Sequence, residues 1–357
     1  MGHPTVENLT PFTFEPLFLA DEEMRPLFVP VVKATYEISP QGKLTPAEEQ
    51  EPLQVAGKKW DDSDESSDRY EPEAAFFKPA TDVVLVGHAH AMERNTREVL
   101  VALKVGALQK GVKVIGDRVW FKSMGSIAMT KPAPFERIPL RYERAFGGWD
   151  RSHPEAAKHT FEPRNPVGTG FRAAGSRFEE GVRLPNLEDP TQLVEDWGDI
   201  PPPAGFGFIG PNWQPRAAFA GTYDAAWEKS RKPLLPKDFD RRFLNAASPG
   251  LIAPGYLLGN EPVVIANATP EGRLSFQLPG VPPPRVQVVR ADQPDAAITL
   301  QLDTVIVDTD VMRLFLLWRG HLVLKREPLE VRAIRVQPGS APEPPVKRPS
   351  STMRAVK

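Results

Sequence analysis

The sequence has no cysteine among its 357 residues, and its charges nearly cancel. The absence of cysteine excludes disulfide bonds and zinc sites built on thiolates, and it fits a reducing compartment. The 44 lysines and arginines against 46 aspartates and glutamates leave a formal net charge of −2. Such a chain lacks the basic excess of a dedicated nucleic-acid or anionic-membrane binder. We therefore expect neither of these as a partner.

Long apolar segments are also missing. The longest apolar run, Leu314–Trp318, is far shorter than the roughly 20 residues that a membrane-spanning helix requires. The first residues show no basic stretch followed by an apolar one, and Val6 stands where a myristoylation signal has Ser or Thr. We expect a soluble, cytoplasmic protein without membrane insertion.

Proline, in contrast, is abundant. The 40 prolines are spread along the whole chain, at about twice the usual share of roughly 5%. Long helices are disfavoured, because an interior proline costs a helix about 3 kcal/mol. Strands bounded by Pro and Gly turns fit better. The prediction is a mainly β fold, with β-sandwich or jelly-roll-like sheets, a long ordered Pro/Gly-rich insert and a few short helices.

Strand patterns occur at both ends of the chain. Leu27–Ile38 is β-rich, and its proline suggests an edge strand. Asp82–His90 is nearly all apolar, which predicts a strand buried on both faces. The remaining predicted strands are Glu98–Val105, Lys113–Phe121, Arg273–Leu278, Ile298–Asp308, Val311–Trp318 and Glu330–Val336.

The middle of the chain has no regular period. Residues 132–258 contain many Pro/Gly turns, with short helices predicted at most over Asp189–Trp197, Tyr223–Ser230 and Lys237–Ala246. A structureless loop of this length does not fit a compact domain, so we expect an ordered insert. Residues 1–336 then form a single domain, or two β lobes over about 1–131 and 259–336 that flank the insert. The Pro/Ser-rich basic residues 337–357 are predicted to be a disordered tail.

Two short motifs resemble a dinucleotide-binding site and a metal site, but the residues around each do not fit such a site. Residues 205–210 read G-x-G-x-x-G, but Pro201–Pro203 precede them and no helix pattern follows, so a dinucleotide site is disfavoured. His88 and His90 share one face of a predicted strand, but no third metal ligand accompanies them. We predict no cofactor and no metal site.

Acidic residues of the insert leave an enzyme open. Two carboxylates could perform acid/base catalysis on a glycan or cell-envelope substrate, with Glu143 or Asp224 in a cleft. Two carboxylates roughly 5–10 Å apart in one pocket would favour this alternative. No G-x-S-x-G motif occurs, and no coherent catalytic set can be singled out.

Aromatic and arginine residues are concentrated in irregular segments, above all in Pro211–Ala247. Trp, Tyr and Arg dominate the hot spots of protein interfaces. They also hold irregular chain onto a scaffold through ring packing and Arg–carboxylate pairs. The residues predicted to bind a partner are Trp120, Tyr142, Arg144, Trp149, Trp213, Arg216, Tyr223, Asp224 and Trp227.

An ordered series of strings resembles one bacterial family, labelled domain of unknown function 2169, from about Leu9 to Val336. The strings are KPATDVVLVGHAHA (78–91), GDRVW (116–120), PLRYERAFGG (139–148), NPVGTG (165–170), LPNLEDP (184–190), WQPRAAFAGTYDAAW (213–227), PLLPKDFDRRFLNAA (233–247) and LDTVIVDTD…LWRG (302–320).

The resemblance implies a function in type VI secretion. Members of the family are associated with type VI secretion gene clusters and are thought to act as accessory chaperones or adaptors. In that role they help to load a toxic effector, often carrying a PAAR-type tip domain, onto the spike. The expected partners are therefore a secreted effector and PAAR or spike proteins. The resemblance implies no catalytic residues. A structural component of the secretion apparatus is a further alternative.

Overall fold

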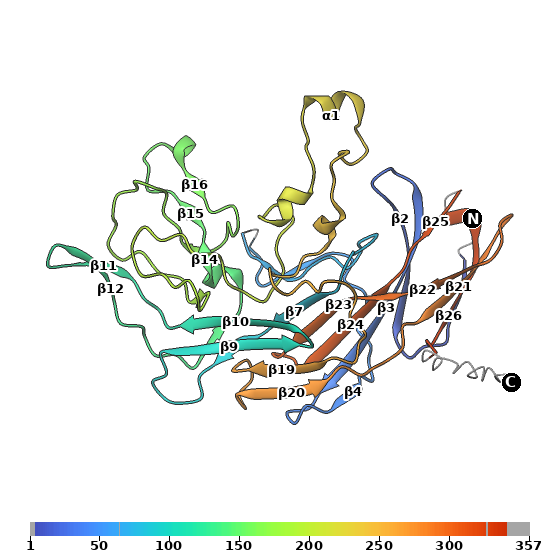
Figure 1. The fold of residues 1–357 in the computed structure, drawn as a ribbon, viewed down its shortest axis with the longest axis horizontal. Coiled ribbons are helices and arrows are strands. Elements are labelled where there is room, and N and C mark those ends of the chain that lie inside the picture. Colours follow the sequence, from blue (N-terminus) through green and yellow to red (C-terminus); the bar gives the residue numbers. More distant parts are fainter. Residues whose placement is uncertain (1–3, 64, 326–327, 341–357) are drawn as a thin grey trace, which may run out of the picture.

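The computed structural model describes residues 4–63, 65–325 and 328–340. Across these residues the fold is mainly β, as predicted, and three larger sheets carry most of the strands (Figure 1). The predicted basic tail lies outside the described residues from 341 onward. Within the described residues, no helix has the length and apolarity that crossing a membrane would require.

The largest sheet combines strands from both ends of the chain. Its order is β2 (Thr13–Ala20), β3 (Pro26–Ile38), β24 (Arg313–Arg319), β23 (Gln301–Asp308) and β7 (Asp82–Val86), while β4 (Leu44–Pro46) and β25 (Leu322–Val323) also pair with β3. The predicted edge position of residues 27–38 is wrong, because β3 lies between β2 and β24. Pro30 is tolerated there because it faces Pro16 on one side and lies just past the end of β24 on the other.

A second sheet packs onto the same core. Its order is β18 (Leu187–Glu188), β10 (Leu108–Ile115), β9 (Glu98–Val105), β19 (Pro262–Ala266) and β20 (Arg273–Gln277). The predicted strand Glu98–Val105 forms as β9, and its alternating pattern buries Val101, Leu103 and Val105. These side chains and those of the largest sheet, including the fully buried Phe28 and Trp318, form one continuous core, which gives a sandwich-like arrangement.

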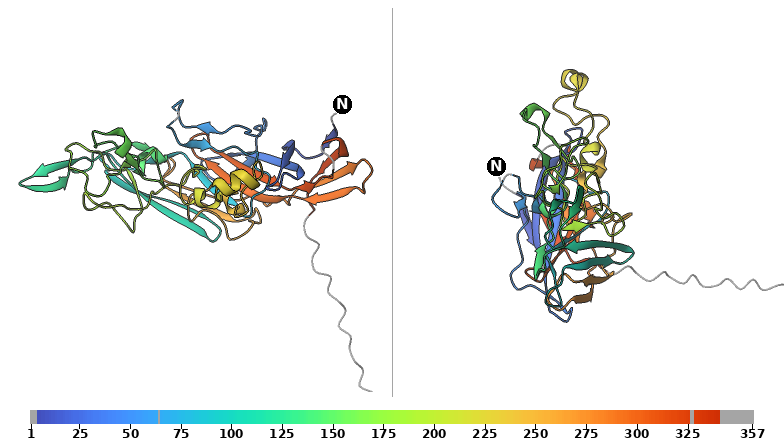
Figure 2. Two further views of the ribbon diagram at one scale, coloured as in Figure 1. Left: turned by 90° about the horizontal axis from the view of Figure 1, so that it is seen from above. Right: turned by 90° about the vertical axis from the view of Figure 1, so that its left-hand side faces the viewer.

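The third sheet lies at one end of the elongated molecule (Figure 2). Its order is β1 (Thr5–Asn8), β26 (Val331–Gln337), β21 (Arg285–Arg290) and β22 (Ala296–Thr299). The predicted strand Ile298–Asp308 is thus divided between two sheets at Leu300. The two-stranded pairs are β5 (Lys58–Lys59) with β6 (Asp68–Tyr70), β8 (His88–His90) with β13 (Arg137–Pro139), β11 (Trp120–Ser123) with β12 (Ser126–Met129), β14 (Phe146–Gly147) with β17 (Thr169–Gly170), and β15 (Trp149–Asp150) with β16 (Thr160–Phe161).

Helices are short in the described chain. The α-helix is α1 (Ala225–Ser230), within one predicted segment, and the 3₁₀ turn η4 (Arg241–Leu244) lies within another. No helix forms over residues 189–197, where Asp189 and Glu188 instead accept hydrogen bonds from nearby backbone N–H groups. The other 3₁₀ turns are η1 (Tyr142–Arg144), η2 (Ala156–Lys158), η3 (Arg216–Phe219) and η5 (Pro328–Glu330).

The insert covers the free edge of β7. Val83 N–H donates to Leu251 O at 2.9 Å and Leu85 N–H donates to Phe206 O at 3.3 Å. All five residues of β7 are buried as a result, although the strand ends the hydrogen-bonded order of its sheet. The irregular insert is therefore ordered by backbone hydrogen bonds to the scaffold, as well as by side-chain packing.

Candidate functional site

A buried charge network fixes the insert to the largest sheet. Lys78 Nζ contacts Glu71 at 2.6 Å and Asp82 at 2.8 Å, and all three side chains are almost fully buried. Asp82 also accepts hydrogen bonds from the Asn245 side chain and the Ala246 N–H, each at 2.9 Å. Burial alone would lower the pKa of Lys78, but the carboxylates of Asp82 and Glu71 raise it overall. The network thus holds a charged lysine between β7 and the insert.

Arg216 extends this network from the insert side. Its guanidinium donates to the Ile209 and Phe243 carbonyl oxygens, each at 2.8 Å, and lies 3.3 Å from Glu71. It also lies over the Phe243 ring, 5.2 Å from the centroid. Most of the donor capacity of Arg216 is thus used within the chain, so its role is to hold the insert in place.

Tyr142 forms the second anchor. Its side chain is buried, its ring meets Trp213 edge to face at 5.5 Å, and its hydroxyl donates to Ser248 Oγ at 3.0 Å. A Cβ at Gly205 would lie 2.9 Å from the Tyr142 ring, so this close approach requires glycine. Burial raises the pKa of the Tyr142 phenol. Tyr142 and Trp213 are thus brought together as a packed pair.

The G-x-G-x-x-G segment is part of this core. Phe206 and Phe208 are fully buried, and Phe208 forms an isolated bridge with Ala247. The residues that follow are turns and the 3₁₀ turn η3, so no helix N-terminus is available for a pyrophosphate. Gly205 and Gly210 serve close packing of the insert, because a Cβ there would lie 2.9 Å from Tyr142 and 3.0 Å from Trp213.

Two adjoining cavities lie beside these anchors, since Arg216 lines the first and Tyr142 lines the second. The first, of about 270 Å³, is walled mainly by apolar side chains, among them Phe219 and Ile252. The second, of about 180 Å³, contains Lys110 and Tyr142. Both cavities share the walls Ile209, Pro215 and Pro249. We call these two cavities the insert groove. An apolar concavity on rigid chain is a typical place for a partner side chain to insert.

Three of the predicted residues lie together on an arm. Residues 220–240 rise from the insert and carry α1 at their tip (Figure 1). Tyr223 packs against Trp227 at 4.7 Å, and its side chain is 52% exposed. Asp224 accepts the Trp227 N–H at 2.8 Å and so caps α1. Arg231 and Arg241 pair with Glu23 and Glu22 of the β2–β3 turn, which fixes the base of the arm.

The cap provides a test of how independent the arm is. Replacing Asp224 with Ala removes the acceptor for the Trp227 N–H. The loss of such a capping side chain typically costs a helix about 1 kcal/mol of stability. We expect faster amide exchange at Trp227 and its neighbours in α1, with little change in global unfolding, because the arm is peripheral. Asp224→Asn retains a capping oxygen and should exchange nearly as the wild type does. If Asp224→Ala lowered the free energy of global unfolding by about the same 1 kcal/mol, the arm would not unfold independently of the rest of the protein.

The remaining predicted residues are dispersed. Trp120 is buried in a small separate cluster against Trp197, Leu184 and Val194. Arg144 lies 3.4 Å from Asp117 and donates to the Asn186 side chain at 3.0 Å. Trp149 is 41% exposed. The nine predicted residues therefore include two local groups, Tyr142 with Trp213 and Tyr223 with Asp224 and Trp227, rather than one continuous face.

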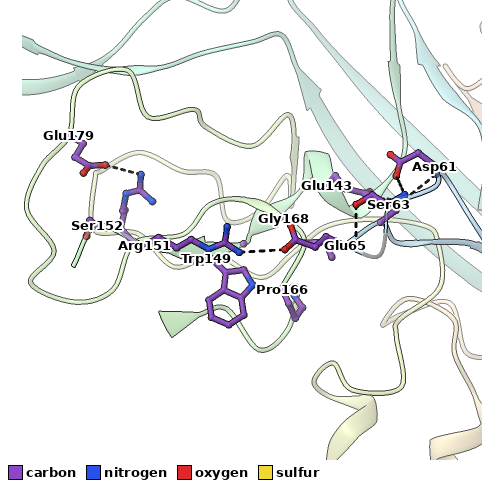
Figure 3. Close-up of a pocket in the computed structure, with 14 residues that line it drawn as sticks. Asp61, Ser63, Glu65, Glu143, Trp149, Arg151, Ser152, Pro166, Gly168 and Glu179 are labelled. Carbon is purple, nitrogen blue, oxygen red and sulfur yellow. Dashed lines mark hydrogen bonds and ion pairs between the residues drawn. The ribbon is translucent and has the colours of Figure 1, made fainter. Parts of the chain in front are cut away.

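Trp149 borders a polar cavity of about 560 Å³ (Figure 3). Arg151 lies over the Trp149 ring at 5.5 Å and contacts Glu65 at 3.5 Å. Glu143 accepts hydrogen bonds from the Ser66 and Ser67 hydroxyls at 3.0 and 2.8 Å. The carboxylates that line this cavity are Asp61, Glu65, Glu143 and Glu179.

These carboxylates bear on the hydrolase alternative. Asp61 pairs with Arg141 at 3.0 Å, and its pKa is lowered, first by a backbone hydrogen bond from Ser63. Glu179 pairs with Arg172 at 3.3 Å. A general acid needs a raised pKa, whereas the lowered pKa of Asp61 favours its charged form. Asp224, the other carboxylate considered, lies on the arm and caps α1.

The two histidines of β8 differ in their surroundings. His88 Nδ1 lies 2.7 Å from an Asp310 carboxylate oxygen. Burial, then the neighbouring His88, lowers the pKa of His90. Over the described ranges, His, Asp and Glu side chains form no group of three or more that could hold a metal ion.

Sequence reasoning missed Lys110 and Ile252 of the insert groove. Lys110 lies in the middle of a strand, and Ile252 follows the segment that was singled out. A signal for Lys110 was its inward position: its neighbours Val112 and Val114 on the same face of β10 are both buried.

Comparisons with known proteins place the chain in a family. The model described as "Uncharacterized protein conserved in bacteria (DUF2169)" matches residues 23–319. No curated protein and no solved structure matches the chain. Since the family match covers most of the sequence, from the β2–β3 turn to the end of β24, the chain belongs to the bacterial DUF2169 family.

Proposed function

We propose that the protein is a non-enzymatic adaptor or chaperone that binds a type VI secretion effector and helps to load it onto the secretion spike. The insert groove is the observation that carries the proposal. Its larger cavity is apolar, it lies on chain that the Lys78 and Tyr142 anchors hold in place, and it opens beside the arm. Its two cavities suit inserted side chains of a partner better than a reacting small molecule.

The family strings support the secretion context. Two of the strings that resemble the family, at 213–227 and 233–247, lie within Pro211–Ala247 of the insert. The same segment forms part of the groove wall through Pro215, Arg216 and Phe219. A chaperone for a secreted toxin has to cover apolar surface of its client until delivery. The proposal therefore takes the effector as the partner and its loading onto a PAAR or spike protein as the outcome.

Ile252 offers a direct test, because its side chain lines the groove and is 39% exposed. Ile252→Asp places a charge in an apolar wall, and we expect at least a tenfold loss of co-purification with the effector encoded beside the gene. The matched control is Ile127→Asp, since Ile127 is 42% exposed on the β11–β12 hairpin at the far end of the molecule (Figure 2). Effector abundance and delivery should fall in cells that carry Ile252→Asp.

The outcomes separate the alternatives. Normal effector stability and delivery in a deletion strain would overturn the proposal. Equal loss with Ile252→Asp and Ile127→Asp, both with wild-type thermal unfolding, would contradict the groove as the binding site. Stoichiometric presence of the protein in purified sheath or spike particles would instead identify a structural component of the apparatus.

A further inference from the structure

Among the residues that the structure describes, Lys110 is a partly buried cation with no carboxylate partner. Its Nζ donates to Ser248 Oγ and to Pro249 O, the latter at 2.8 Å. In the described part of the chain, no carboxylate oxygen lies within 4.0 Å of this nitrogen. Burial lowers the pKa of Lys110 to about 8, and Asp189, the acidic residue that most favours its charge, only partly offsets this. The amine is therefore charged at neutral pH and short of a counter-charge.

The other cations of the insert groove already have such partners. Arg216 contacts Glu71, Arg164 contacts Glu162 at 2.7 Å, and Arg242 contacts Asp240 at 2.6 Å. Asp189 accepts hydrogen bonds from the Thr191 N–H and hydroxyl at 2.8 and 2.7 Å. Lys110 is thus the groove cation that an incoming anion can compensate most effectively, because a desolvated charge gains most from a partner.

The two halves of the groove differ in chemistry. The larger cavity has apolar walls, whereas the smaller one holds Lys110. The shared walls make the two cavities neighbours, so one short stretch of chain can fill both. In an extended segment, side chains at alternate positions point to the same side.

We infer that the insert groove binds an extended peptide segment of a protein partner, with an apolar side chain in the larger cavity and, two positions away, a carboxylate paired with Lys110. This deepens the proposed function, because it takes the groove as the docking site of the client and names the chemistry that is recognised. The committed occupant is a peptide segment, not a free small acid.

Two peptides test this on the purified full-length protein. They are acetyl-Ala-Leu-Ala-Glu-Ala-amide and the same peptide with Gln in place of Glu, followed by NMR through the δ1 methyl signals of Ile209 and Ile252. We expect the Glu peptide to bind roughly tenfold more tightly at pH 7, the size of one charge-assisted hydrogen bond. Lys110→Met should abolish the difference. Lys113→Met should keep it, because Lys113 lies on the same strand but pairs with Glu98 at 3.0 Å.

The pH dependence gives a readout without any mutation. The preference for Glu should fade as the pH rises through about 8, where Lys110 loses its charge. The other charged groups that line the smaller cavity are Asp189 and Arg164. The side-chain hydrogen bond with Glu162 raises the pKa of Arg164, so its guanidinium stays charged over this range. The pKa of Tyr142 is raised by burial, so its phenol stays neutral.

Three results would overturn the inference. They are equal binding of both peptides by the wild type, no change in the Ile209 and Ile252 methyl signals, and binding of 4-methylpentanoate as tight as that of the Glu peptide. The last result would indicate a site for a free small acid. If Lys110→Met does not fold, the wild-type pH series decides. The peptide experiment contains no secretion component. A negative result would therefore contradict the binding chemistry of the groove and would leave the role in secretion to the effector experiments.

Discussion

Replacing Lys78 with Met is expected to lower the free energy of unfolding by about 3–5 kcal/mol, the usual loss when one member of a buried ionic group is removed. Lys78 lies between Glu71 at 2.6 Å and Asp82 at 2.8 Å, and the three side chains are almost fully buried. Met fills similar volume, so the loss comes from two carboxylates left without their central cation. Urea unfolding of the variant and the wild type measures the difference.

The pH dependence of this loss identifies its cause. Burial already raises the pKa of Glu71, and removal of Lys78 raises it further. A carboxyl group with a higher pKa in the folded state favours that state most at low pH and loses this contribution as the pH rises. The deficit of Lys78→Met should therefore shrink as the pH falls toward the ordinary glutamate value of about 4.3.

The matched control is Lys113→Met, which removes an ion pair with Glu98 whose side chains are 28% and 57% exposed. Exposed pairs are worth about 0–1 kcal/mol, so this variant should unfold close to the wild type. A pH-independent loss at Lys78, or equal losses for Lys78→Met and Lys113→Met, would show that packing rather than charge explains the effect.

The strands could be predicted because their signals are local. The predicted strands Glu98–Val105 and Arg273–Leu278 are found as β9 and β20, and the alternation in each reflects one buried face. The edge assignment of residues 27–38 failed because a proline's effect depends on what lies opposite it. Pro16 and the end of β24 are set by tertiary pairing, which the sequence of β3 alone does not contain.

The site was harder to predict, because anchoring and binding use the same residue types. Tyr142, Trp213 and Arg216 have the composition of a hot spot, yet their rings and donors are largely satisfied inside the chain. Lys110 and Ile252 line the insert groove, but no local sequence pattern marks them. Lys110 reaches the groove because its strand lies against Ser248 and Pro249, which are more than 100 residues away in the sequence. Long-range contacts of this kind leave no periodic trace.

Tyr142→Ala is expected to lower the free energy of unfolding by about 3–5 kcal/mol, the usual range for removing a large buried aromatic side chain. The ring contacts Trp213 on one side and Gly205 on another, and it lines the smaller cavity of the insert groove, so its loss enlarges that cavity. Tyr142→Phe removes only the hydroxyl. It should cost about 1 kcal/mol, because Ser248 Oγ still accepts a hydrogen bond from Lys110.

A double-mutant cycle with Gly205 tests whether the ring itself determines this packing. Gly205→Ala alone should be destabilising, because the new Cβ would lie 2.9 Å from a Tyr142 ring carbon. In a Tyr142→Ala background that clash is absent, so the second substitution should be nearly neutral, and the two effects should be non-additive by at least about 1 kcal/mol. Urea unfolding of the four proteins measures the coupling. Additive effects would mean that Gly205 is required for another reason and that Tyr142 does not set the position of the insert above β7.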